Sequence, residues 1–141
     1  TVHVYDPAQV TVAVNPATVT LLPGGTQTFS ATVNNAPNGG TLTWSVSSGG
    51  GTTNASTGAY TAPATAGTYT VTATSSWGKS GTAIVTVKTL DLNGDGAVDV
   101  LDVLQLTKRW AGTEAADLAV ADLNGDGVIG DADLSLLLNA I

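Results

Sequence analysis

The sequence predicts two domains: an all-β sandwich, followed by a small all-α domain built around two repeated loops. Up to about residue 88, short runs alternate apolar with small or polar side chains, which is typical of half-buried strands. Beyond residue 90, a twelve-residue pattern occurs twice, and each copy leads into a leucine-rich stretch with helical spacing. The composition also changes near Lys88, from threonine and glycine to leucine, alanine and aspartate. We therefore expect an N-terminal strand in residues 1–7, the sandwich in 8–88 and the second domain in 89–141.

Alternation of side chains defines the strands of the first domain. In residues 41–46, for example, Leu42, Trp44 and Val46 fall on one face. That periodicity favours core packing of Trp44 over a role in stacking on a sugar. Threonine dominates the opposite faces, where its β-branched side chain suits an extended backbone. The expected strands are residues 10–14, 26–33, 41–46, 67–74 and 81–87.

Over residues 8–88 the chain resembles a bacterial immunoglobulin-like domain. The resemblance is carried by VNPATVTLLPGGTQTFSATV, by Trp44 and by GAYTAPATAGTYTVTATS. It implies that Tyr69 is a corner tyrosine, and that Ala31 and Val71 stand where related sandwiches can place a disulfide. An architecture this widespread indicates little about function by itself.

The repeated pattern reads DLNGDGAVDVLD at residues 91–102 and DLNGDGVIGDAD at residues 122–133. Oxygen-bearing side chains occupy positions 1, 3, 5 and 12, and glycine occupies position 6, which is the spacing of an EF-hand-type calcium loop. Gly96 and Gly127 allow the sharp turn that makes alternate side chains converge. Aspartate–glycine turns without a metal are the simpler alternative. Two copies at matching spacing favour two Ca²⁺ ions.

The predicted ligands follow from the loop positions. In the first loop they are Asp91, Asn93, Asp95, the Ala97 carbonyl, Asp99 (directly or through water) and Asp102. In the second loop they are Asp122, Asn124, Asp126, the Val128 carbonyl and Asp133. Gly130 has no side chain, so water is expected to fill position 9 there. The first loop thus has four carboxylates and the second has three, which predicts weaker binding in the second.

The acidic residues are concentrated in the second domain. The whole chain has a net charge of −7, and ten of its eleven acidic residues lie between Asp91 and Asp133. Two bound Ca²⁺ ions would leave a charge of about −3, so the acidity is explained by metal ligation. A basic nucleic-acid footprint is absent from the sequence. The chain has no cysteine and no membrane-spanning apolar run. We expect an extracellular, secreted or cell-surface location, where calcium is abundant.

Residues 90–141 resemble a dockerin. The resemblance is carried by the two calcium loops, by aspartate at position 12, and by a connecting stretch, TEAADLAVADLNGDG, at residues 113–127. It implies helices at Leu101–Trp110 and Asp131–Asn139, and no helix before the first loop. We expect a small core from Leu101, Leu104, Leu106, Leu134, Leu137 and Leu138. Folding should be coupled to the metal, because the loop carboxylates repel one another.

The dockerin resemblance also implies a protein partner, a cohesin-like module. In that family, loop positions 10 and 11 and the following helix face the partner. These positions are Val100 and Leu101 in the first repeat but Asp131 and Ala132 in the second. We therefore predict one binding orientation, led by the first repeat. Lys108 and Arg109 either form a polar rim for the partner or complement the helix C-terminus.

Two other functions compete with attachment to a cohesin. Residues 1–5, TVHVY, resemble the last strand of the sandwich. They are either the end of an upstream domain or a strand donated to an identical subunit, which would build a filament or surface layer as a homo-polymer. A carbohydrate-binding sandwich, with Trp77 as the exposed aromatic residue, is a further alternative. We do not expect an enzyme, because His3 is the only histidine and most carboxylates are assigned to calcium.

Overall fold

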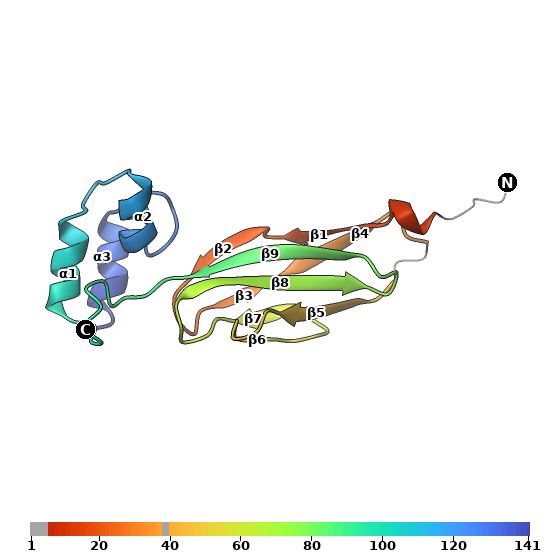
Figure 1. Cartoon of the computed structure of the whole chain (residues 1–141), viewed down its shortest axis with the longest axis horizontal. Coiled ribbons are helices and arrows are strands. Elements are labelled where there is room, and N and C mark those ends of the chain that lie inside the picture. The colour runs from red at the N-terminus through yellow and green to blue at the C-terminus, as the bar shows by residue number, and fades with distance from the viewer. Residues whose placement is uncertain (1–5, 38–39) are drawn as a thin grey trace.

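The computed structural model describes residues 6–37 and 40–141. The strands form an elongated body, with the three α-helices gathered at one of its ends and the short helix η1 (Pro7–Gln9) at the other (Figure 1). The segment for which we predict strand donation, residues 1–5, lies outside the described residues. That prediction is therefore untested.

Three sheets make up the β domain. The largest has the order β2 (Thr18–Leu21), β9 (Ser80–Val87), β8 (Gly67–Ser75), β5 (Leu42–Val46). A second pairs β1 (Thr11–Asn15) with β4 (Ser30–Asn34), and a third has the order β3 (Thr26–Thr28), β7 (Ala59–Thr61), β6 (Thr52–Thr53). All pairs are antiparallel except β2 with β9, in which Thr18 faces Ile84 and Leu21 faces Val87.

The strand predicted at residues 26–33 is wrong as a single element. It divides into β3 and β4, which belong to different sheets. The division falls at Phe29, whose backbone N–H donates to the carbonyl of Gly58 at 3.0 Å. Alternation gives the face on which a side chain lies but not the partner strand, so the sequence could not reveal this change of sheet.

The sandwich core centres on Phe29, which is 1% exposed. Its ring lies 6.3 Å from Trp44 and 6.0 Å from Tyr60, the latter edge-on, a geometry that aromatic pairs favour. Trp44 is buried in this cluster, which confirms its predicted place in the core. Tyr69 donates its hydroxyl to the Thr65 carbonyl at 3.0 Å, as a corner tyrosine does.

The second domain consists of α1 (Val100–Thr107), α2 (Ala115–Ala121) and α3 (Asp131–Leu138). Its buried core is Leu106, Ala121, Leu123, Ile129 and Leu137. Leu101, Leu104 and Leu138, which we expected in the core, are about half exposed instead. Two residues of the second loop, Leu123 and Ile129, take their place. The repeated loops therefore supply part of the core and not only polar ligands.

Candidate calcium-binding loops

The two loops repeat one hydrogen-bond network. The carboxylate at position 1 accepts the backbone N–H groups of positions 4 and 6. In the first loop, Asp91 accepts from Gly94 at 2.7 Å and from Gly96 at 3.0 Å. In the second, Asp122 accepts from Gly125 at 2.7 Å and from Gly127 at 3.0 Å. The same sequence pattern thus folds into the same loop twice.

Glycine at positions 4 and 6 makes this loop possible. Gly94 and Gly96 have φ values of +79° and +91°, and Gly125 and Gly127 have values of +78° and +86°. Other residues adopt this left-handed region at a cost, because their Cβ crowds the backbone. These turns direct the backbone N–H groups of the glycines toward the carboxylate at position 1. The resulting hydrogen bonds fix that carboxylate inside its loop.

The carboxylate at position 12 lies at the base of each loop, and Asp102 and Asp133 are both 0% exposed. Asp102 accepts from the backbone of Leu92 at 2.7 Å, Asn93 at 3.1 Å and Asp99 at 2.8 Å. Asp133 accepts from the equivalent positions, which are Leu123 at 2.7 Å, Asn124 at 3.2 Å and Gly130 at 2.9 Å. Each carboxylate therefore ties the start of its loop to the helix that follows.

Backbone donors stabilise the ionised form of Asp102. Burial is the largest single influence and acts to raise its pKa, but the N–H groups of Asp99, Asn93 and Leu92 together outweigh it and lower the pKa. Among the described residues, neither Asp102 nor Asp133 has a cationic side chain within ion-pair distance. A buried carboxylate without a charged partner is costly, so each loop base suits a bound cation.

The ligand set is chemically suited to calcium, because its side chains and carbonyls offer only oxygen, which hard cations prefer. Within the described residues, however, no three His, Cys, Asp or Glu side chains converge on one point. Asn93 instead donates to Asp95 at 2.7 Å, and Asn124 to Asp126 at 2.7 Å. Convergence of several carboxylates requires a cation to offset their repulsion. The ligand assignments of both loops thus remain predictions.

The predicted partner-binding residues lie on or just after α1. Val100 is 69% exposed, and Leu101 and Leu104 are about half exposed, so α1 presents a continuous apolar strip. Lys108 is also exposed. Arg109 instead donates to the Gln105 carbonyl at 2.9 Å and lies 3.5 Å from Asp117. Arg109 is thus held by hydrogen bonding and an ion pair just after α1, whereas Lys108 is exposed beside the apolar strip.

A comparison with known families concerns the second domain. Residues 89–141 match the family model of the dockerin type I domain. The chain is therefore a β domain followed by a dockerin. Dockerin domains bind calcium, which supports Ca²⁺ as the ligand of this region. None of the helices in the described part of the chain is long and apolar enough to cross a membrane.

The solved structures that match the chain are distant from it in sequence. Protocadherin gamma B7 (extracellular cadherin domains 1–4) has a TM-score of 0.47 at 16% identity, and the match covers 58% of this chain and 24% of that one. The adhesin InvE of Yersinia pseudotuberculosis has a TM-score of 0.39 at 20% identity, and the match covers 60% of this chain and 27% of that one. An EHEC O157:H7 intimin mutant has a TM-score of 0.42 at 16% identity, and the match covers 83% of this chain and 67% of that one. The chain thus spans about a quarter of the first two. No curated protein matches the chain.

Proposed function

We propose that this chain is a non-catalytic, extracellular attachment module. Its dockerin binds two Ca²⁺ ions and a cohesin-like protein partner, and its sandwich serves as a spacer. The observation that carries the proposal is a hydrogen-bond network that occurs in both loops of the region matching the dockerin family. In each loop, a buried carboxylate at position 12 accepts backbone N–H groups from the start of the loop. Such a network is a scaffold for cations, and in dockerins calcium serves protein attachment.

Calcium would complete the loops by binding the side-chain oxygens at positions 1, 3, 5 and 12 and the carbonyl at position 7. Bound metal would supply positive charge where the carboxylates crowd. The chain's own residues do the rest: the left-handed glycines shape the loop, and Asp102 and Asp133 join each loop to its helix. Since Leu123 and Ile129 belong to the core, a loop that loses its shape also loses core packing.

The partner surface is the apolar strip of α1, formed by Val100, Leu101 and Leu104. Exposed apolar side chains gathered on one helix face are typical of docking surfaces. The equivalent positions in the second repeat, Asp131, Ala132 and Ser135, are small or charged. The first repeat therefore leads binding, in a single orientation, with Lys108 at the rim.

Titration calorimetry against a panel of cohesin modules tests the proposal. We expect binding in Ca²⁺ and none in EDTA. Replacing Leu101 with aspartate should weaken binding at least 30-fold, roughly the cost of losing one hot-spot side chain. The matched change in the second repeat, Ala132→Asp, should have little effect. Equal losses from both would contradict the single orientation, and binding unaffected by EDTA would contradict the calcium dependence.

A further inference from the structure

The two loops differ in what surrounds them. The first ligand of the second loop, Asp122, is 7% exposed, and the next residue, Leu123, is 1% exposed. Their equivalents in the first loop, Asp91 and Leu92, are only partly buried. The second loop also approaches the sandwich, whereas the first loop has open space at the matching position.

The first contact is between Gly125, at position 4 of the second loop, and Thr20 on β2. A Cβ added to Gly125 would lie 2.5 Å from the Cβ of Thr20 and 3.2 Å from its Cγ2. Gly94 occupies position 4 of the first loop with nearly the same φ, yet a Cβ added there would meet nothing within 4 Å. The close approach is therefore a feature of the second loop's environment, since the two loops share their own geometry.

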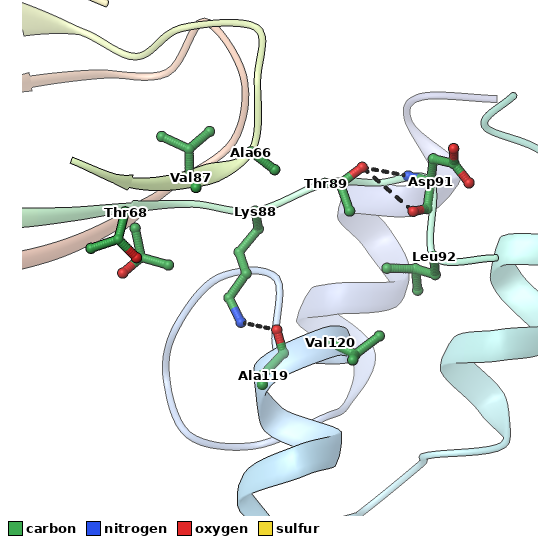
Figure 2. A pocket seen from close by; sticks show the side chains of 11 residues that line it. Ala66, Thr68, Val87, Lys88, Thr89, Asp91, Leu92, Ala119 and Val120 are labelled. Carbon is green, nitrogen blue, oxygen red and sulfur yellow. Dashed lines mark hydrogen bonds between the residues drawn. The ribbon is translucent and has the colours of Figure 1, made fainter. Parts of the chain in front are cut away.

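The second contact is made by Lys88, which follows β9. Its Nζ donates to the carbonyl of Ala119 at 2.7 Å, near the C-terminus of α2 (Figure 2). It also donates to the carbonyl of Leu118 at 3.0 Å. The Leu118 carbonyl also accepts the backbone N–H of Asp122 at 3.4 Å. Lys88 and the first ligand of the second loop thus share an acceptor. A cation here also complements the helix dipole.

Two further features lie at the boundary between the domains. A crevice of about 270 Å³ opens beside Lys88, between Thr68 and Thr86 of the sandwich and Asp91 and Val120 of the dockerin (Figure 2). Leu22, which follows β2, adds an apolar contact to the dockerin core. Among the described residues, no hydrogen bond joins residues 91–102 to the sandwich. The interdomain hydrogen bonds of Lys88 and the close approach of Thr20 therefore lead to the second loop, whereas Asp91 of the first loop only lines the crevice.

We propose that calcium in the second loop, and not in the first, locks the sandwich and the dockerin in one relative orientation. The inference rests on the proposed binding of calcium by both loops. Linkage makes the effect reciprocal: if the ion stabilises docking, docking raises the affinity of that ion by the same factor. The number of carboxylates predicts a lower calcium affinity in the second loop than in the first. Docking on the sandwich raises the calcium affinity of the second loop and so acts against that difference.

A matched pair of glycine variants in the full chain tests the affinity. Calcium titration followed by NMR at the amides of Gly96 and Gly127 reports each loop separately. Gly94→Ala and Gly125→Ala impose the same left-handed strain, but only the second places a methyl group against Thr20. Gly125→Ala should therefore weaken its own site roughly tenfold more than Gly94→Ala weakens the other. Adding Thr20→Gly to Gly125→Ala should restore most of the loss. Equal losses, or no restoration, would overturn the inference.

Residual dipolar couplings in the same samples test the orientation. With calcium, the couplings of both domains should fit one alignment tensor. Asp126→Ala, in the second loop, should give two tensors, whereas the matched Asp95→Ala in the first should keep one. If Asp126→Ala unfolds the dockerin, Lys88→Met replaces it, because Lys88 is neither a predicted ligand nor a core residue. Lys79→Met, at the opposite end of β9, is its control.

The outcomes separate this inference from the proposed function. If the couplings of both domains fit a single alignment tensor in Asp126→Ala and in Lys88→Met, the second loop does not control the domain orientation. The proposed calcium binding would be unaffected by that result. If neither Gly96 nor Gly127 responds to calcium, the proposed function itself fails.

Discussion

The two domains reach stability by different means. Among its described residues, the sandwich buries ten core residues, Phe29 included, and none of them is charged. The dockerin buries only five apolar residues and places two carboxylates, Asp102 and Asp133, at zero exposure beside them. A small core offsets little conformational entropy. The sandwich is therefore specified by its apolar pattern, whereas we expect the dockerin to depend on what its carboxylates bind.

Removal of calcium should have the largest effect on this contrast. We expect EDTA to abolish most of the helical circular dichroism and the heat-capacity peak of the dockerin. The peak of the sandwich should remain. An ion whose free concentration is 1,000 times its dissociation constant adds about 4 kcal/mol to the free energy of unfolding, which is a large part of a small domain's stability. Calorimetry with and without chelator measures both peaks, and a dockerin peak unchanged in EDTA would remove the contrast.

Phe29→Ala should produce the converse effect. Loss of a fully buried phenylalanine costs about 3–5 kcal/mol through lost burial and the cavity left behind. The sandwich peak should therefore move to a much lower temperature, while calcium titration of the dockerin keeps both sites. Ile84→Ala, on a half-exposed strand position, is the control and should cost much less.

Asp102→Asn sharpens the role of the buried carboxylates. The amide removes the charge and turns an NH₂ group toward backbone donors, which should destabilise the dockerin by about 2–3 kcal/mol. Asp99→Asn changes the same charge at a less buried position and should cost less than half as much. Chemical denaturation followed by helical circular dichroism compares them, and equal costs would argue against a special role for burial.

Tyr60→Phe should have the smallest effect and concerns the sandwich alone. The Tyr60 hydroxyl is buried and has no hydrogen-bond partner among the residues that the structure describes. Burial, with a smaller influence from Tyr69, raises its pKa. The folded state thus disfavours ionisation, so this residue's contribution is present below pH 10 and is lost as pH rises above it. Tyr60→Phe should change stability at pH 7 by no more than about 1 kcal/mol. Denaturation at pH 7 and at pH 11 measures the free energy of unfolding of both chains. Between these two pH values, the variant should lose less of it than the original chain.

The sequence predicts local structure better than contacts between elements. Repeated spacing was enough to predict two loops of matching conformation and the helices after them, and alternation was enough to place Trp44 in a core. Calcium binding by the loops stays a prediction. The same alternation could not show that Phe29 divides a strand between two sheets. Leucine spacing also misplaced Leu101 and Leu104 in the core, because helical periodicity does not say which face is covered. Apolar side chains at loop positions 2 and 8, such as Leu123 and Ile129, were the available signal.

Contacts between the domains were beyond the sequence. Nothing in the pattern around Thr20 or Lys88 indicates that one meets Gly125 and the other the end of α2. The first six residues of the two loops are identical, so the different burial of Asp91 and Asp122 could not be read from those residues.

Native mass spectrometry of the full chain tests whether two cations hold the dockerin loops. We expect two Ca²⁺ ions in the intact chain, one in Asp95→Ala, one in Asp126→Ala and none in the double variant. If the chain carries no calcium at millimolar concentration and its helices are intact, calcium does not hold the loops.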